Sequence, residues 1–264
     1  MSLVLATAQR AFDAVPLYRA LYGRRPERVE DVPFISASAF HRAQRPLDVI
    51  TTPDGLRGVV PAFSRHGRRL PVAVLESEEE WRLRRDRLHH ALSVLDATPA
   101  PSRRYAIVTD DSSGPFASDI SNFLAWDRTA CSIVFVWDSP QRVETALAAV
   151  SPDIVLVAGA AALVPRLTKA GRKLVACVPV DGAPDDFLYL DRLLVSDEMF
   201  VMGAAPVNEA AYRFDPRSVI AEIDPATGRL AVTTLAFNCF ALVRYCLDLP
   251  VDPRPTDRDV HARL

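Results

Sequence analysis

The stretch YAIVT (105–109) begins the part of the chain that decides the fold. Three more apolar runs follow it, CSIVFVW (131–137), DIVLVAG (153–159) and KLVACVPV (173–180). Helices are expected in the gaps, at about 117–127, 140–149 and 160–170. Strands that alternate with helices are typical of βαβ units, and continuously apolar strands suit a sheet covered on both faces. The fold class predicted is therefore α/β, with a mostly parallel sheet flanked by helices.

The flanking sequence adds helices before this core and strands after it. Apolar residues recur every three to four positions over 2–22, where Pro16 should break the helix. The segment 76–95 has a capping box at Ser77 and Glu80 and a clear apolar face. Its arginines are expected mostly to face water: Arg82, Arg84, Arg85 and Arg87. After residue 193, RSVIAEI-DPATG-RLAVTTL predicts an antiparallel hairpin, so a smaller antiparallel portion is expected in the C-terminal third.

Composition narrows the classes of protein and partner. The chain has 264 residues, 49% of them hydrophobic and 24% charged, and a net charge of −2. This is typical of a globular protein and gives no general reason to bind nucleic acid or an anionic membrane. No run approaches the roughly 20 apolar residues of a membrane span, so a cytoplasmic location is expected. The four cysteines have neither zinc-site nor disulfide spacing and are expected to be reduced.

Three blocks carry a resemblance to a known family. They are VPLYRALYGRRPERVEDVPFISASAF (15–40), VSPDIVLVAGAAALVPRL (150–167) and AEIDPATGRLAVTTLAFNCFALVRYCLDL (221–249). In this order they resemble the phenylacetate-CoA ligase branch of the adenylate-forming (acyl-CoA synthetase/ligase) superfamily. The resemblance implies an N-terminal domain of that type over 1–250, followed by an extended tail at 251–264. Because the sequence stops about where the family's hinge begins, the mobile C-terminal domain with its catalytic lysine is expected to be missing.

The family's glycine-rich phosphate loop corresponds to VVPAFSRHGRRLP (59–71), where most glycines are replaced. Glycines let backbone N–H groups close on phosphate oxygens, so ordinary phosphate binding is not expected here. The retained Ser64 and the cations Arg65, Arg68 and Arg69 would still attract an anion. The arginines would lower the pKa of His66 and keep it a neutral base. The alternative is a solvated basic hairpin.

Two further family motifs are altered. In SDEMFVMGAAPV (196–207), Asp197 and Phe200 remain, but Gly203 stands where the magnesium-binding Glu is expected. The resemblance then implies no metal site, and no cofactor is predicted. In RYCLD, the residues Arg244, Tyr245 and Asp248 remain, but the loop is one residue shorter and has lost the family's Thr-Gly. An Asp on a shortened loop need not point at a ribose.

The strand 105–109 is followed by a polar turn with Asp110, Asp111, Ser112 and Ser113. The carboxyl end of a parallel strand is where open α/β sheets bind ligands. The alternative is a plain turn in which Ser118 or a neighbour caps the next helix. His89 and His90 are adjacent on a helix, cannot both bind one metal, and are expected at or near the surface.

These segments together predict one cleft. Arg65, Arg68 and Arg244 would bind an anionic group, and His66 or Asp111 would accept a proton. Asp248 would orient a polar part of the substrate. Further substrate contacts are expected from Ser64, Arg69, Asp110, Ser112, Ser113, Asp197, Phe200 and Tyr245.

Three functions fit this cleft. The first is a catalytic subunit of a two-component enzyme in specialised natural-product metabolism, such as antibiotic biosynthesis. It would act on a small phosphate, sulfate or carboxylate substrate, by elimination or by intramolecular amine displacement that forms an aza-ring such as an aziridine. A small partner protein would replace the missing domain, or the chain would form a homodimer, and a carrier protein could hold the substrate.

The second function is a residual carboxylate-adenylating or acyl-transferring enzyme that borrows its lysine domain from a partner. The third is a non-catalytic binding or scaffold protein. The missing metal Glu argues against the second function, and the cationic loop argues against the third. A self-sufficient acyl-CoA ligase is not expected.

Overall fold

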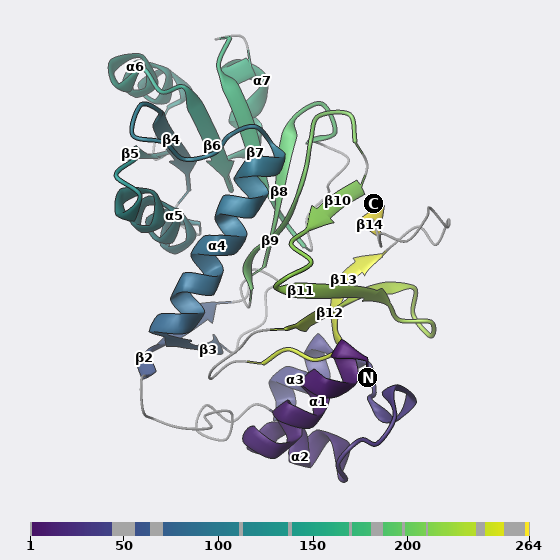
Figure 1. Cartoon of the computed structure of the whole chain (residues 1–264). Helices are drawn as coiled ribbons and strands as arrows, with labels where there is room; N and C mark the ends of the chain where they lie inside the picture. The colour runs from purple at the N-terminus through teal and green to yellow at the C-terminus, as the bar shows by residue number, and fades with distance from the viewer. Residues whose placement is uncertain are drawn as a thin grey trace.

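The computed structural model describes residues 2–43, 56–63, 71–110, 113–136, 139–168, 171–180, 187–196, 199–209, 211–235, 241–250 and 262–263. An eight-stranded sheet forms the upper part of the molecule as drawn in Figure 1. Its strand order is β14-β10-β9-β8-β7-β6-β4-β5. The bounds are β4 (Arg104–Thr109), β5 (Ala130–Phe135), β6 (Ile154–Ala158), β7 (Lys173–Pro179), β8 (Asp191–Ser196), β9 (Phe200–Ala205), β10 (Ala211–Phe214) and β14 (Ala262–Arg263).

Strands β4 to β8 run parallel to one another, and β9, β10 and β14 are antiparallel. The four predicted parallel strands correspond to β4, β5, β6 and β7. Side chains of β4 alternate between two cores. Tyr105 and Ile107 pack with α4 (Glu78–Val94) and α5 (Gly114–Trp126). Ala106 and Val108 pack with α6 (Pro140–Val150), η2 (Ala161–Leu163) and α7 (Val164–Leu167). Cover on both faces explains why these strands carry no polar alternation.

Helix α4 corrects the expectation for two of its arginines. Arg82 is exposed, but Arg84 and Arg87 are buried. Helix α4 packs along β9, and Nη2 of Arg87 donates a hydrogen bond of 3.1 Å to the carbonyl oxygen of Met199. Burial lowers the pKa of the Arg87 guanidinium to about 10. The buried face of α4 therefore includes two arginines as well as the apolar residues.

A four-stranded sheet with the order β1-β13-β12-β11 forms the second part of the fold. The bounds are β1 (Ile35–Ser36), β11 (Val219–Ile223), β12 (Arg229–Thr234) and β13 (Tyr245–Pro250). The predicted hairpin is β11–β12, and its turn is held by Asp224, whose carboxylate accepts bonds from Ala226 N (3.0 Å) and Thr227 Oγ1 (2.6 Å). Gly228 closes the turn at φ +67°.

The N-terminal helices pack in one core with this sheet. They are α1 (Leu3–Ala14), α2 (Pro16–Tyr22), η1 (Val29–Asp31) and α3 (Ala37–Ala43). As expected, the helix breaks at Pro16, which starts α2. The buried Tyr18 hydroxyl donates to Ala241 O (2.9 Å) and accepts from Val243 N (3.0 Å), which joins the two ends of the chain.

A separate hairpin pairs β2 (Leu56–Phe63) with β3 (Pro71–Ser77), with Phe63 opposite Pro71. Residues 64–70 connect its strands and lie outside the described residues. Within the described part of the chain, no helix combines the length and apolar character needed to cross a membrane.

Candidate functional site

The parallel sheet changes its winding direction between β4 and β6. The chain leaves β4 through α5 to β5 on one side, then crosses through α6 to β6 on the other side of β4. The helices α5 and α6 cover opposite faces. Open α/β sheets bind ligands at the carboxyl ends of strands at such a topological switch point. We use "switch point" for Asp110 and Ser113, after β4, and Gly159, after β6.

Gly159 allows these segments to meet. Its φ is +77°, and a Cβ atom on it would lie 2.4 Å from Ser113 Oγ and 2.5 Å from each carboxylate oxygen of Asp110. Only glycine permits both the conformation and the approach. Three polar oxygens therefore converge at the end of β6.

Ser113 has a buried hydroxyl without a partner. Its backbone N–H donates to Asp110 Oδ1 at 2.8 Å, and the residue precedes α5 as its N-cap. The Ser113 side chain makes no capping bond, the residue is 1% exposed, and its Oγ has no hydrogen-bond partner. A buried hydroxyl of this kind costs about 1–3 kcal/mol of desolvation unless a ligand or water meets it.

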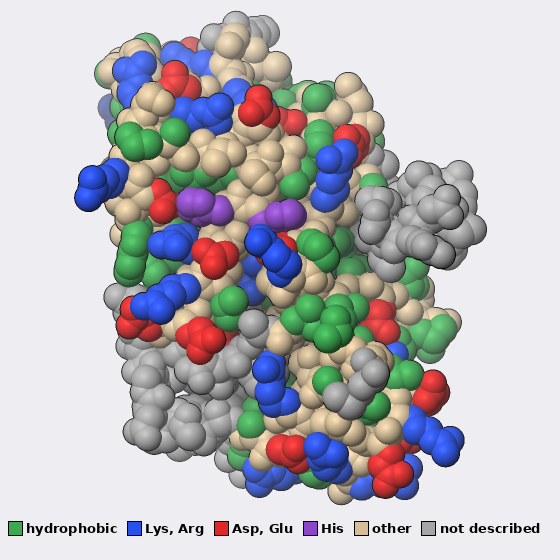
Figure 2. Space-filling model, viewed as in Figure 1, with side chains coloured by type: hydrophobic (Ala, Val, Ile, Leu, Met, Phe, Trp, Pro, Cys, Tyr) green, Lys and Arg blue, Asp and Glu red, His purple; other side chains and the backbone are tan. Residues whose placement is uncertain are grey.

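A polar groove of about 590 Å³ lies between α4 and the segment that precedes β11, and the sequence did not indicate it. Its lining residues are Leu83, Asp86, His89, His90, Ser93, Thr98, Asp215, Arg217 and Ser218. The two histidines lie near the surface, as expected (Figure 2). His89 Nε2 is 2.5 Å from Asp127 Oδ2.

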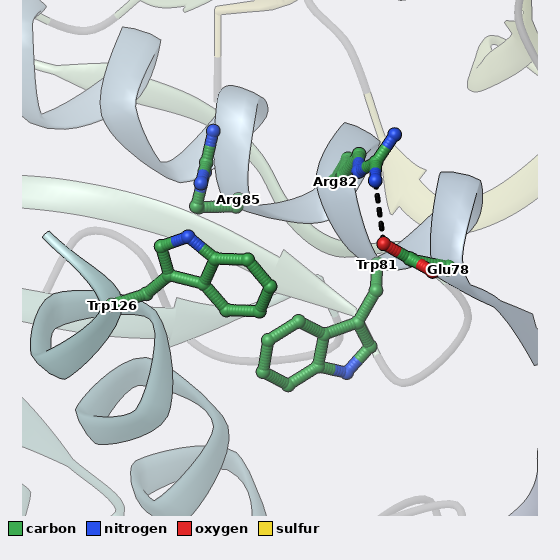
Figure 3. A pocket seen from close by; sticks show the side chains of 5 residues that line it. All are labelled: Glu78, Trp81, Arg82, Arg85 and Trp126. Carbon is green, nitrogen blue, oxygen red and sulfur yellow. Dashed lines mark hydrogen bonds and ion pairs between the residues drawn. The ribbon is translucent and has the colours of Figure 1, made fainter.

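A smaller slot on α4 and α5 contains two tryptophans (Figure 3). The ring centroids of Trp81 and Trp126 are 6.0 Å apart, and the Arg85 guanidinium lies 5.8 Å from the Trp126 ring. Glu78 pairs with Arg82, one turn further along α4, at 2.5 Å. Its volume of about 10 Å³ is too small for a substrate.

Several predicted site residues lie outside the described residues, most of them in the basic loop 64–69 or in the polar turn after β4. These predicted site residues are Ser64, Arg65, His66, Arg68, Arg69, Asp111, Ser112 and Asp197. Their roles stay predictions. Of the predicted cleft, the structure brings together Asp110 and Ser113 and adds Gly159.

Comparison with known proteins rests on structure. No protein-family profile matches the chain, and no curated protein matches its sequence. Among solved structures, an open conformation of 2-hydroxyisobutyryl-CoA ligase with 2-HIB-AMP and CoA superimposes with a TM-score of 0.68 at 16% identity, over 93% of this chain and 67% of the ligase. The chain has the fold of the N-terminal domain of adenylate-forming ligases.

Two more distant structures agree with this assignment. An amide bond synthetase from Marinactinospora thermotolerans matches with a TM-score of 0.50 at 16% identity, over 72% of this chain and 42% of the synthetase. An ATP-bound RpMatB-BxBclM chimera matches with a TM-score of 0.51 at 14% identity, over 70% of this chain and 40% of the chimera. The chain covers 61% of the length of the ligase in two other 2-hydroxyisobutyryl-CoA ligase structures.

Phe200 stands where the adenylate-forming resemblance implies a base-stacking aromatic. It is buried in the core of the sheet, 4.8 Å from the Phe116 ring and 5.3 Å from the Phe123 ring. Its φ is +70°, an unusual conformation for a bulky residue. A substrate contact by Phe200 stays a prediction, and in this structure its ring packs against α5.

Arg244 is fully engaged by the protein itself. Its guanidinium donates to Glu222 Oε1 (2.9 Å) and Oε2 (3.2 Å), to Val29 O (2.9 Å) and to Val32 O (2.8 Å). It also lies 4.5 Å from the Phe34 ring centroid. The predicted role in anion binding is untested, but these bonds tie β13 to β11 and to the N-terminal segment.

Tyr245 and Asp248 follow Arg244 on β13. Tyr245 is buried, pairs with Ile35 of β1, and meets Phe40 edge-to-face with centroids 5.2 Å apart. Asp248 lies within the strand, and its side chain is outside the described atoms. Their substrate roles stay predictions.

The magnesium of adenylate-forming enzymes does not fit the residues described. A Cβ at Gly203 would lie 2.9 Å from Arg213 O and 3.3 Å from the Phe214 ring, so this position in β9 has no room for a carboxylate side chain. Among the described residues, no cluster of three His, Cys, Asp or Glu side chains is suited to a metal. We therefore derive no step through magnesium.

Proposed function

We propose that the chain is an adenylate-forming-like catalytic subunit that binds a small substrate with both an amine and an anionic leaving group. The observation that carries the proposal is the buried Ser113 hydroxyl, without a partner, beside Asp110 at Gly159. A substrate N–H that met Ser113 Oγ would satisfy this hydroxyl. The fold supplies the scaffold, and the switch point supplies the site.

The charge at the switch point favours the amine end of the substrate. The Asp110 carboxylate already accepts the Ser113 N–H at the start of α5, the position at which a free anion would otherwise bind. A second negative charge there would be repelled, whereas an ammonium group would be attracted. We place the anionic end at the cations of the basic loop, Arg65, Arg68 and Arg69.

The reaction proposed is an intramolecular displacement. The amine nitrogen forms a bond to a substrate carbon while the C–O bond to the phosphate, sulfate or carboxylate breaks, and the leaving group departs with the electron pair. The ammonium group first loses a proton to a carboxylate at the strand end or to His66, because only the neutral amine has the electron pair that forms the new bond. The product is a small aza-ring, as in specialised natural-product metabolism. A small partner protein and a carrier protein are part of the proposal.

A second candidate is a residual adenylating or acyl-transferring enzyme, which the likeness to CoA ligases and to an amide bond synthetase favours. Carboxylate-dependent pyrophosphate exchange from ATP and magnesium separates the two. We expect no exchange by the purified chain, because the Gly203 position has no room for a metal-binding Glu. Exchange by the chain alone would replace the first proposal with the second.

The first proposal is tested with small probes in calorimetric titrations. 2-Aminoethyl sulfate and phosphoethanolamine carry both groups, whereas ethanolamine and inorganic sulfate carry one each. We expect the two-group probes to bind more tightly than either one-group probe. Ser113→Ala should weaken their binding by about fivefold, the worth of one hydrogen bond of ~1 kcal/mol.

Gly159→Ala should abolish probe binding by displacing Asp110 and Ser113. The matched control is Gly171→Ala, because Gly171 also has a positive φ of +67° but has no atom within 4 Å of its Cβ position. Probe binding that survives Gly159→Ala unchanged would show that the switch point is not the site. Binding of sulfate alone as tight as that of 2-aminoethyl sulfate would contradict the role given to the amine.

A further inference from the structure

The two edges of the eight-stranded sheet are treated differently. At one edge, β10 carries the charged Arg213 and is covered by β14. At the other edge, β5 pairs with β4, and no other described strand pairs with it. Proteins usually protect an edge strand with charges, prolines, bulges or covering segments, because its backbone otherwise pairs with another chain.

Strand β5 has none of these protections in its own sequence. Residues 130–135 read ACSIVF, without a charged residue or a proline, and their register with β4 is continuous from Ala130 to Phe135. Figure 1 shows β5 at the outer margin of the sheet, with α5 and α6 beside it. The strand is therefore a regular, uncharged pairing edge.

The direction of its backbone groups follows from one hydrogen bond. The N–H of Val136, directly after β5, donates to Thr109 O of β4 at 2.9 Å. Backbone groups alternate in direction along a strand, so Ser132 and Val134 also face β4. The N–H and C=O groups of Cys131 and Ile133 then point away from the sheet.

On the α5 side of this edge the exposed residues are uncharged and partly apolar, whereas α6 on the other side exposes Arg142 and Glu144. Trp126, at the end of α5, is 53% exposed, and Phe135, at the end of β5, is 37% exposed. The other exposed residues of α5 are Ser118, Asn122 and Ala125. Depletion of charge with exposed aromatic residues is typical of the centre of a protein interface.

We propose that β5 pairs antiparallel with β5 of a second copy of this chain, on a two-fold axis at Ile133. An isologous interface needs a surface that complements itself, and an uncharged strand meets its own copy without repulsion. With Ile133 on the axis, Cys131 lies opposite Phe135 of the second copy. Phe135 then approaches the start of the partner's β5, where the partner's Trp126 ends α5. The two eight-stranded sheets become one continuous sheet.

The experiment uses charge at the axis. Light scattering of the parent chain should give twice the mass of one chain. Ile133→Lys and Ile133→Glu should each give monomers, because residue 133 faces itself and the like charges repel. An equimolar mixture of the two variants should recover the dimer. Arg213→Glu, on the opposite edge, is the matched control and should remain dimeric.

Circular dichroism should show that each variant keeps its secondary structure. If either charged variant fails to fold, Ile133→Cys combined with Cys131→Ser provides a second test. Facing residues in a hydrogen-bonded antiparallel pair have Cα atoms about 5.5 Å apart, within the reach of a disulfide. Oxidation should cross-link this variant into a dimer. A monomeric parent, charged variants that stay dimeric, or a folded cysteine variant that does not cross-link would each overturn the proposal.

Discussion

Arg244 and the polar residues of the switch point were both expected to bind substrate, but in the structure they differ in whether the protein itself provides hydrogen-bond partners. The Arg244 guanidinium donates hydrogen bonds to both carboxylate oxygens of Glu222 and to the backbone carbonyls of Val29 and Val32. At the switch point, the Ser113 hydroxyl is more deeply buried and has no partner.

This difference indicates that buried polar groups can have two roles, one in stability and one in ligand binding. A buried polar group whose partners all come from the protein holds elements together, and its loss is a loss of stability. A buried polar group without a partner in the protein lowers the stability, and it is retained where a ligand or water provides the missing hydrogen bond. The following predictions test this division, from the largest effect to the smallest.

Arg244→Ala should destabilise the fold most. The side chain is 11% exposed, and its removal leaves the Glu222 carboxylate and two carbonyl groups without their donor. We expect the free energy of unfolding to fall by about 3–5 kcal/mol in a denaturant titration. Arg82→Ala, which removes one member of an ion pair whose side chains are 62% and 61% exposed, should cost less than about 1 kcal/mol. A stable but inactive Arg244→Ala protein would instead support the predicted role in anion binding.

Gly159→Ala should come next. The alanine must adopt a left-handed conformation, which costs roughly 1–2 kcal/mol, and must also displace three oxygens. Gly171→Ala has the conformational cost without the crowding. The difference between the two free energies of unfolding should therefore be positive and should measure the crowding at the switch point. Equal losses would mean that Asp110 and Ser113 move aside freely.

Ser113→Ala should leave the stability unchanged or raise it by up to about 1 kcal/mol, since it removes a buried hydroxyl without a partner. Ser218→Ala is the matched control, because Ser218 is also buried but its hydroxyl donates to Asp215 O at 3.3 Å. The control should lose about 1 kcal/mol. Thermal unfolding of both variants measures the contrast, and a loss at Ser113 as large as at Ser218 would remove the basis for a ligand there.

The smallest effect concerns pH. Burial alone would raise the pKa of the Asp215 carboxyl, but hydrogen bonds from the Arg217 side chain and N–H outweigh burial and hold the pKa below its ordinary value. A lowered folded-state pKa contributes stability above about pH 4, which is lost as the pH falls through the folded-state pKa. The difference in melting temperature between the parent and Asp215→Asn should therefore be larger at pH 7 than at pH 2.5. A difference that grows in acid would contradict this sign.

The sequence predicted the parallel core well because its strands are covered on both faces. The runs at 105–109, 131–137, 153–159 and 173–180 correspond to β4, β5, β6 and β7, and the hairpin at 217–235 corresponds to β11 and β12. The strands β8 and β9 were missed. Residues 196–207 were interpreted through a family motif, and Asp191 and Arg192 interrupt the apolar pattern at the start of β8.

The candidate site was only partly predictable. The position of Asp110 and Ser113 after a parallel strand indicated a ligand-binding edge, and the structure places both at the switch point. Gly159 was expected only as the end of the strand 153–159, but its role depends on Ser113 and Asp110, which lie 46 and 49 positions earlier in the chain. The partners of Arg244 were equally hidden, because Val29 and Val32 lie more than 200 positions away. Sequence patterns report local periodicity and do not show which distant groups satisfy a donor.

The Tyr18 hydroxyl, which joins Ala241 and Val243, has a consequence for how the chain folds during synthesis. The two hydrogen bonds connect residues 223 and 225 positions apart, so α2 cannot reach its final packing until nearly the whole chain has been made. At about 5–20 residues per second, the wait is roughly 10–45 s. During that time the strands from β4 to β8 can pair among themselves, whereas the apolar faces of α1 and α2 have no lasting partner. The N-terminal helices are thus the part of the nascent protein most exposed to aggregation and to capture by chaperones.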